Sequence, residues 1–328
     1  MMSTQSRVAE ADNYRIDKYC RGDYPQKKIE PEIRSQFFCW VSGLLILMAN
    51  KLRHYLQGYI TPRTFSVDDL ERCVDYDFGV VGSWCHYLAS YTDTEYSVVG
   101  KNVLELGPGA DFGNAAILLA RGASSYHSID VNNLIDQTPD EFYDRLFSRL
   151  DEYGECSMDV GSLRQEVRDA QAGMKGLINY VHDQDFDLTR FKDESIGLVV
   201  SQAVFEAFED YEAILRQLTD IMEPGGVLIS EVDISTHTRW IRDFDPLNIY
   251  RYPNWLFRSM SFPGSPSRIR PHEYIKTLQE LGWRNVVAIP IRIASQDYVE
   301  SIENNIGKRF NDPAGQINAL SIMLCATR

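Results

Sequence analysis

Apolar residues recur at helical spacing in the first hundred residues and then gather into short runs between amphipathic segments. The helical spacing predicts two long helices, around 34–57 and 67–91. The short runs predict five strands followed later by two more, at 103–106, 126–130, 178–181, 196–201, 227–232, 286–293 and 317–326. Because strands and helices alternate, we expect a mostly parallel sheet wound by right-handed crossovers.

Two stretches interrupt this alternation. Residues 134–175 are rich in Asp, Glu and Arg and predict an inserted helical pair, whereas residues 235–270 form an insert dense in aromatic residues and arginine. Helices are expected between the strands at 115–121, 211–222 and 271–282. We therefore divide the chain into a helical N-terminal cap or lid (1–100) and an α/β core (101–328) that carries both inserts.

The apolar stretch Phe37–Ala49 needs its own interpretation. Its length of about 13 residues is too short for a membrane-spanning helix, which needs roughly 20. A buried helix of the cap is the simpler reading. A lipid-facing patch or an oily lid over a substrate is the functional alternative.

The excess of acidic residues limits which kinds of partner the chain can bind. Acidic residues number 47 against 33 basic ones, giving a net charge of −14, which repels polyphosphates and makes nucleic acid an improbable partner. The six cysteines form no CxxC pair and no tight cluster with histidine, so we expect no metal site and infer a reducing, cytoplasmic location. The polar N-terminus lacks the apolar core of a secretory signal.

A glycine-rich loop follows the first core strand. Gly107, Gly109 and Gly113 stand between that strand and a helix, with Glu105 two positions before the first glycine. Glycines allow a tight turn and a close approach of the backbone to a ligand, and the helix N-terminus offers free N–H groups. The second strand ends about 20 residues further on at Asp130, where a carboxylate can accept both hydroxyl protons of a ribose.

The loop spacing is GxGxxxG, whereas dinucleotide-binding folds use GxGxxG. An acid just before the first glycine disfavours a pyrophosphate and favours an ammonium group. With this loop, with Ser128-Ile129-Asp130 and with the Met222–Leu228 turn MEPGGVL, the chain resembles class I S-adenosylmethionine-dependent methyltransferases over about residues 102–327. The resemblance implies a Rossmann-like, seven-stranded, mostly parallel sheet whose last strand is antiparallel.

The resemblance also implies binding roles for S-adenosylmethionine. Glu105, Gly107 and Gly109 would border the methionine end of the cofactor, and Asp130 would bind the ribose. The adenine would be held by Phe186 with either Asp183 or Asp185, and Gln202 would lie near the sulfonium. Many relatives carry Glu-His after the fourth strand, but here the pair is Glu206-Ala207, so any base role of that histidine is absent.

The methyl acceptor is expected beyond the fifth strand, which runs into Asp233-Ile234-Ser235-Thr236-His237. Ligands of α/β sheets bind at the carboxyl ends of the strands, and an unperturbed imidazole titrates near pH 6.5. His237 could therefore be a general base, oriented by Glu231 or Asp233. A structural hydrogen bond to the insert, or direct contact with the acceptor, are the alternatives.

The insert could form the wall of the acceptor site. Tyr250, Arg268 and Arg270 are its candidate ligands, because arginine offers a bidentate fork to a carboxylate or phosphate. A packed lid is the alternative.

Altogether the sequence predicts methyl transfer from S-adenosylmethionine to a small or medium organic acceptor, at a hydroxyl oxygen. A non-catalytic cofactor-binding module and an NAD-type oxidoreductase are the competing hypotheses. No metal, nucleic acid or membrane span is expected.

Overall fold

The computed structural model describes residues 26–58, 69–92, 97–154 and 156–328. Its centre is one sheet in the order β1-β7-β8-β6-β5-β2-β3-β4, in which β8 runs antiparallel to both of its neighbours and the other pairs are parallel. The strands are β1 (Lys27–Ile29), β2 (Asn102–Leu106), β3 (Ser125–Asp130), β4 (Ile178–His182), β5 (Ile196–Gln202), β6 (Met222–Asp233), β7 (Arg284–Ala294) and β8 (Ala319–Thr327).

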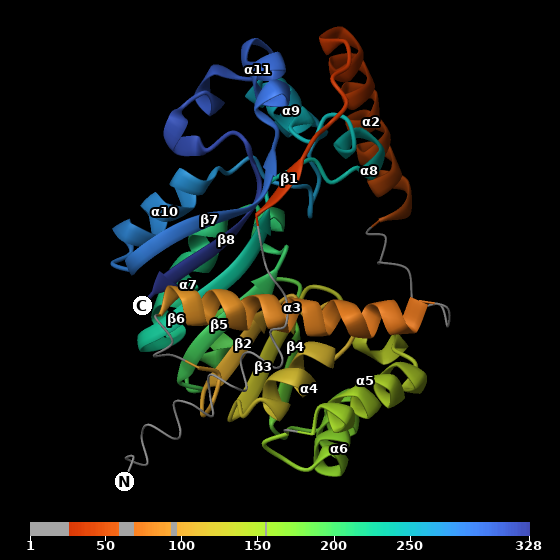
Figure 1. Ribbon diagram of the computed structural model, residues 1–328, viewed down its shortest axis with the longest axis vertical. Helices are drawn as coiled ribbons and strands as arrows, with labels where there is room; N and C mark the ends of the chain where they lie inside the picture. Colours follow the sequence, from red (N-terminus) through yellow and green to blue (C-terminus); the bar gives the residue numbers. More distant parts are fainter. Residues whose placement is uncertain (1–25, 59–68, 93–96, 155) are drawn as a thin grey trace.

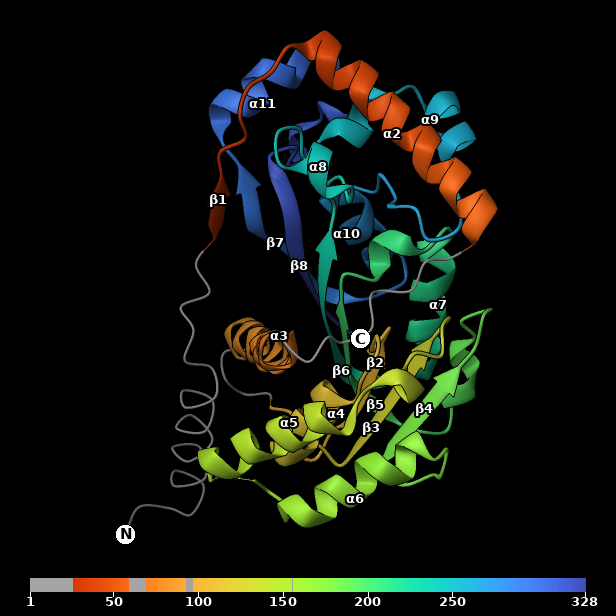
Figure 2. The same cartoon turned by 90° about the vertical axis from the view of Figure 1, so that its right-hand side faces the viewer.

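Helices cover both faces of this sheet (Figures 1 and 2). They are α2 (Gln36–Gln57), α3 (Leu70–Tyr91), α4 (Gly113–Ala120), α5 (Asp140–Tyr153), α6 (Val160–Gln171), α7 (Tyr211–Ile221), α8 (Arg239–Arg242), α9 (Asn254–Met260), α10 (Pro271–Glu280) and α11 (Gln296–Ile302). Short 3₁₀ turns lie between them, including η4 (Phe205–Ala207) after β5 and η5 (Asn248–Arg251) in the insert.

Two apolar cores hold these layers together. One joins α3, α4, α5 and α6 to one face of the sheet, and the other joins α7 and α10 to the opposite face. Interior strands are buried on both faces, which is why β2 and β5 read as continuous apolar runs rather than alternating ones. The expected mostly parallel α/β sheet is confirmed, with seven strands where the sequence predicted them.

An eighth strand, β1, was not predicted. It pairs in parallel with β7 at the edge of the sheet, where Lys27 and Lys28 are exposed. Short, charged strands are typical of sheet edges because they discourage pairing with other chains. Three residues with two lysines give no periodic signal in the sequence.

The two helices described before residue 100 pack in different places. Helix α3 packs on α4 and α5 within the main core, whereas α2 lies with η5, α8 and α9 of the 235–270 insert. In Figure 2, α2 lies across the end of the molecule toward which β6 points. The predicted cap therefore contains one helix of the core layers and one helix that closes over the insert.

A buried ion pair anchors the insert to α2. Asp245 accepts hydrogen bonds from the Arg251 guanidinium, from Tyr298 and from Asn248, and both charged side chains are fully buried. The Asn248 amide also donates to the carbonyl of Cys39 in α2. Every polar group that the insert buries here has a partner, as a low dielectric requires.

We expect Asp245→Asn to destabilise the fold, because the substitution leaves the Arg251 guanidinium buried without its counter-charge. The free energy of unfolding, measured by urea titration, should fall by about 3–5 kcal/mol. Glu212→Gln is the control, since it breaks the exposed Glu212–Arg216 pair and should change stability by less than about 0.5 kcal/mol. Equal effects of the two substitutions would contradict this account.

Candidate active site

The strand order reverses between β2 and β5, so their carboxyl ends leave a crevice at which ligands bind in open α/β sheets. The glycine loop occupies one side of this crevice. Gly107 and Gly109 have φ of 66° and 80°, a left-handed backbone that favours glycine. A Cβ on Gly107 would lie 2.6 Å from a Val204 methyl group, whereas a Cβ on Gly109 would meet no described heavy atom within 4 Å. The loop therefore packs on one side and is open on the other.

Glu105 lies beneath the glycine loop rather than on its open side. Its carboxyl oxygens accept hydrogen bonds from the Asn114 amide at 3.0 Å and from the Tyr126 hydroxyl at 2.7 Å, and the side chain is fully buried. Burial raises the pKa of Glu105 to about 7, and these two hydrogen bonds oppose the rise. The residue thus supports the loop from the core.

Helix α3 contributes a carboxyl group that the sequence did not single out. Asp77 is buried against Asp111 of the glycine loop, and its Oδ2 occupies the space that a Cβ on Gly113 would need. Burial raises the pKa of Asp77 well above its usual range and that of Asp111 to about 6, and the proximity of Asp111 raises the pKa of Asp77 further. The N-terminus of α4, where a dinucleotide fold holds its pyrophosphate, therefore already faces two carboxyl groups.

Tyr76, next to it on α3, is also absent from the sequence prediction. Its side chain is more than half exposed, yet burial of the hydroxyl region and the charge of Glu231 raise its pKa to about 12. Asp77, Glu105 and Asp111 add to this rise. The Tyr76 hydroxyl is thus close enough to the end of β6 and to the acids around the glycine loop to be influenced by their charges.

Acidic residues end the next two strands. Asp130 is held at the end of β3 by main-chain N–H groups, with 2.8 Å from Asn132 N to Oδ1 and 3.4 Å from Gly109 N to Oδ2. Asp183 follows β4 and accepts from Asp185 N at 2.9 Å and from Arg190 Nε at 2.6 Å. These bonds, that of Asp185 first, lower the pKa of Asp183.

The two candidates for the adenine contact therefore differ. Asp183 is fixed beside Asp130, whose carbonyl accepts from Asp183 N at 3.0 Å, whereas the Asp185 side chain is exposed. Phe186 is buried in a left-handed backbone conformation with φ of 54°, and its ring meets Phe208 edge-on. Such a conformation in a bulky residue is strained and is common at functional sites.

The ends of β5 and β6 bring an imidazole to a buried carboxyl group. Gln202 donates to Glu231 at 2.7 Å, and His237 Nε2 lies 3.8 Å from Oε1 of Glu206, which is fully buried in η4. Burial raises the pKa of Glu206 well above its usual range, opposed by main-chain N–H groups and reinforced by the nearby Asp233 and Glu231. From the sequence, Glu206 was notable only because Ala207 follows it where many relatives have histidine.

The expected orientation of His237 by Glu231 or Asp233 needs correction. Asp233 accepts from Ser235 at 3.0 and 2.6 Å and faces Arg242 and Arg292 at 3.9 and 3.6 Å, while Glu231 is bonded to Gln202. The carboxyl group that faces His237 belongs to Glu206. Asp233 instead fixes the turn that carries the imidazole.

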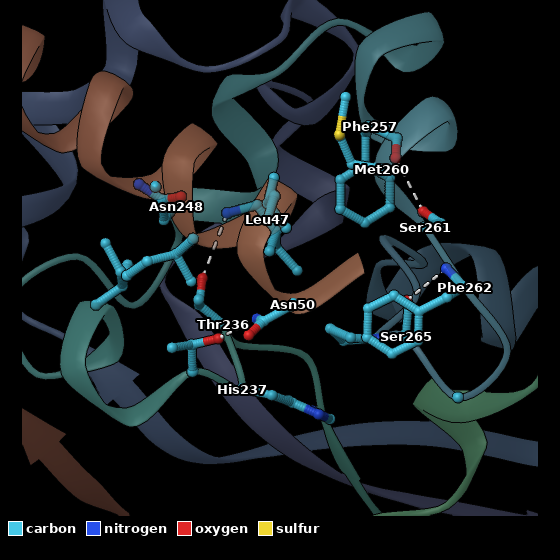
Figure 3. A pocket seen from close by; sticks show the side chains of 17 residues that line it. Leu47, Asn50, Thr236, His237, Asn248, Phe257, Met260, Ser261, Phe262 and Ser265 are labelled. Atoms are coloured by element: carbon cyan, nitrogen blue, oxygen red, sulfur yellow. Dashed lines mark hydrogen bonds between the residues drawn. The ribbon is translucent and has the colours of Figure 1, made fainter. Parts of the chain in front are cut away.

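His237 also borders a pocket of about 150 Å³, which we call the apolar pocket (Figure 3). Figure 3 shows Leu47 and Asn50 of α2 facing Phe257, Met260 and Phe262 across it, with His237 at its edge. The other lining residues are Gly43, Ile46, Thr236, Thr238, Ile241, Asn248, Ile249, Ser261, Gly264, Ser265 and Pro266. Residues from the cap and from the insert thus form one pocket.

The three predicted acceptor ligands lie elsewhere. Arg270 is fully buried and donates to the carbonyls of Gly315, Gln316 and Ala319 and to the Tyr250 hydroxyl. That hydroxyl in turn donates to the Ile234 carbonyl.

Arg268 likewise donates to the carbonyls of Ile249 and Tyr252 and stacks on Phe257, 4.2 Å from the ring centre. The prediction that Tyr250, Arg268 and Arg270 bind an acceptor is therefore wrong. Main-chain carbonyls take their hydrogen bonds, so they hold the packed insert together.

Within the described ranges, no helix has the length and apolar composition needed to cross a bilayer. In the same residues, no three His, Cys, Asp or Glu side chains are grouped as metal ligands would be.

The fold and this crevice define a nucleotide-cofactor-binding α/β enzyme, and a family comparison makes the class specific. A family model described as a methyltransferase domain matches residues 79–288. The chain therefore belongs to this methyltransferase family and is a class I S-adenosylmethionine-dependent enzyme. The non-catalytic and NAD-dependent hypotheses are not supported.

Solved structures with related folds share little sequence with this chain. The CurJ carbon methyltransferase is 16% identical, with a TM-score of 0.44, over 89% of this chain and 68% of that one. An S-adenosylmethionine-dependent methyltransferase from Mesorhizobium loti is 12% identical, with a TM-score of 0.40, over 74% and 97%. PigF, solved with S-adenosylhomocysteine, is 12% identical, with a TM-score of 0.40, over 89% and 70%. No curated protein matches the chain.

The crevice fits the cofactor of this family. Gly109 borders open space, Asp130 keeps lone pairs for two hydroxyl groups, and the Gln202 amide oxygen has no hydrogen-bond partner among the described residues. The carboxyl groups at the start of α4 suit a cationic methionine group better than a phosphate.

The raised pKa of Glu105 predicts a pH-dependent stability. Between its ordinary value of 4.5 and about 7, the folded chain binds a proton at Glu105 that the unfolded chain releases. The free energy of unfolding should therefore fall as pH rises through this window, by about 3 kcal/mol in full. Glu105→Gln stays neutral and should flatten that part of the dependence in urea unfolding at several pH values. Equal pH slopes for both proteins would refute the assignment.

Proposed function

We propose that this methyltransferase acts on a hydroxyl oxygen of a small organic acceptor that carries an apolar group of about the size of a benzene ring. The observation that carries the proposal is His237, which borders the apolar pocket and faces Glu206 at the carboxyl end of β5. The acceptor would fill the pocket, with its hydroxyl at the imidazole.

The crevice supports specific cofactor contacts. We assign the ribose hydroxyls to Asp130, which ends β3 beside the glycine loop, and the adenine amino group to Asp183 rather than Asp185, because Asp183 is the fixed one. Phe186 would pack against the adenine ring. Gly107 and Gly109 would let the backbone approach the methionine portion closely.

Gln202 and Tyr76 complete this proposed site. The partnerless amide oxygen of Gln202 lies at the end of β5, where the sulfonium is expected, and Tyr76 covers the crevice from α3. Glu105 would act indirectly, by holding the loop from beneath through Asn114 and Tyr126.

When bound, S-adenosylmethionine supplies a methyl group on a positively charged sulfur. The chain must hold the acceptor oxygen in line with that methyl group, and this positioning is a large part of such catalysis. His237 removes the proton from the acceptor hydroxyl, which makes the oxygen a better nucleophile. About 37% of the His237 side chain is exposed, so the proton can pass to solvent.

Glu206 would assist this proton transfer. Burial raises the pKa of Glu206 and favours its uncharged form. When the imidazole takes up the acceptor's proton, the carboxyl group of Glu206, 3.8 Å away, stabilises the new positive charge, and the proton then leaves from His237 to solvent. The pair can thus carry the charge until the proton leaves.

The pocket indicates the kind of acceptor. A cavity of about 150 Å³ has room for one benzene ring, and here aliphatic and aromatic side chains line it together with polar ones such as Asn50 and Thr238. Leu47, Ile241, Phe257 and Phe262 form its apolar wall, and Asn50 lies between them and Thr238, to which it donates at 2.9 Å. A phenol or a similar cyclic alcohol fits both the volume and the imidazole.

We expect Asp130→Ala to weaken binding of S-adenosylhomocysteine, the reaction product, by roughly 30- to 1,000-fold in calorimetric titration. This range corresponds to about 2–4 kcal/mol for two lost charge-assisted hydrogen bonds. Asp151→Ala, which removes an exposed acid on α5, is the control. An unchanged affinity in Asp130→Ala would remove the ribose assignment.

We also expect His237→Ala to lower methyl transfer by about 10²–10⁴-fold, with S-adenosylhomocysteine affinity changed no more than a few-fold. Turnover is measured as S-adenosylhomocysteine release against a panel of phenols, cyclic alcohols and matched anilines. Glu206→Gln should lower turnover less than His237→Ala and alter its pH profile, because the amide cannot ionise. His272→Ala on α10 is the control. Undiminished turnover in His237→Ala, or methylation of anilines alone, would falsify the hydroxyl-base proposal.

A further inference from the structure

Helix α2 is apolar on two opposite faces. Its inner face, with Cys39 and Gly43 buried and Leu47 and Asn50 half-buried, packs on the insert and lines the apolar pocket. Its outer face carries Phe38, Val41, Leu45, Met48, Leu52 and Tyr55, which we call the outer stripe. A helix that is apolar all round is normally buried all round.

The outer stripe has the spacing of a helix-pairing surface. Its six residues follow one another at steps of three, four, three, four and three, so they form one line along the helix. Five of them are exposed large apolar side chains, Tyr55 at 84% and Leu45 at 60% among them. The flanking Ser42 and Ala49 are small, so another helix can approach closely.

The exposed area is large for a surface facing water. Phe37 and Leu56 flank the outer stripe, and Trp240 of α8 extends it, since Trp240 and Phe38 both contact the Phe244 ring. Together these side chains offer on the order of 800 Å² if each aromatic ring presents about 200 Å² when fully exposed. Monomers rarely expose such a patch, and about 800 Å² per partner is what a specific interface buries.

The backbone dipole of α2 favours a second copy in antiparallel orientation. Between Gln36 and Gln57 the helix has no acid, and the exposed Glu30 and Glu32 before it are already paired with Lys28 and Arg34. Side-chain charges therefore do not set the orientation. In an antiparallel pair the N-terminal end of each helix lies beside the C-terminal end of the other, and such opposed helix dipoles are favourable.

We propose that the outer stripe pairs with the outer stripe of a second copy of this chain, as an antiparallel, two-fold symmetric helix pair. A two-fold pair buries the same surface on both copies, which a self-complementary stripe allows. Leu45 of each copy then lies against Met48 of the other, at the centre of the contact. Since the inner face of α2 is a wall of the apolar pocket, the pairing also holds that wall in place.

The test is sedimentation equilibrium of the full chain over a wide concentration range. The unmodified protein should be a dimer. Leu45→Glu/Met48→Glu places like charges at the centre and should weaken dimerisation by at least about 100-fold. Leu45→Glu/Met48→Lys sets each Glu against the partner's Lys and should dimerise at least about 10-fold more tightly than the first variant.

Met174→Glu is the matched control, because Met174 is an exposed apolar residue in the turn before β4, away from α2. Unchanged S-adenosylhomocysteine affinity in every variant shows that the fold and the cofactor site are intact. A monomeric unmodified protein would overturn the proposal, as would a dimer that both double variants leave unchanged.

Lipid is the other occupant that an apolar helix face could take, so flotation with vesicles is included. Neutral phosphatidylcholine vesicles and vesicles containing phosphatidylglycerol are used separately. The net charge of −14 opposes binding to the anionic vesicles. Flotation of the unmodified protein that Leu45→Glu/Met48→Glu abolishes, together with a monomer in solution, would assign the outer stripe to a membrane surface instead.

Discussion

The contact between α3 and the start of α4 sets the character of the cofactor crevice. Asp77 lies so close to Gly113 that no side chain fits there, and it brings a second carboxyl group to Asp111 at a helix N-terminus. In a dinucleotide-binding fold that helix end faces a pyrophosphate. Here the same helix end faces the carboxyl groups of Asp77 and Asp111, and Glu105 is buried beneath it. These groups suit a cationic ligand better than a phosphate. The third glycine of the motif serves this close approach of α3.

A second constraint acts at the other end of the strands. The insert has few regular elements, and its buried polar groups are satisfied partly from within, by the Asp245–Arg251 pair and the bonds of Arg268 to carbonyls. Arg270 adds bonds to carbonyls of the segment before β8 and at its start. This internal network fixes η5 and α9, on which α2 rests. The pocket wall is therefore built from an ordered insert rather than from a loose loop, and the turn carrying His237 is held by Asp233 through Ser235.

The sequence predicted the sheet well because its central strands are largely buried and stand between clear helix and glycine signals. The glycine loop, Asp130 and His237 lie at or after strand ends in the structure, where the sequence placed them, because each follows directly from a clear strand signal. The sequence did not predict the role of a residue where that role depends on which groups its side chain contacts. Arg268 and Arg270 look like anion ligands in a sequence, and only the fold shows that carbonyl groups take their hydrogen bonds. His237 faces Glu206 although the two residues lie in turns 31 residues apart in the sequence. No local sequence pattern reveals such a contact.

Helix α2 explains why the stretch Phe37–Ala49 resisted a single interpretation from sequence. Its sequence is compatible with a buried helix and with an oily lid, and in the structure its inner face lines the apolar pocket while its outer face is exposed. Because both faces belong to one helix, a partner that holds or displaces the outer face also holds or displaces Leu47 and Asn50 on the inner face. Among the described elements, α2 packs mainly on η5, α8 and α9 of the insert, and Leu44 and Leu47 also pack against the apolar cluster that contains Tyr298 and Phe310. We therefore expect a partner bound to the outer stripe to hold this wall of the pocket in place.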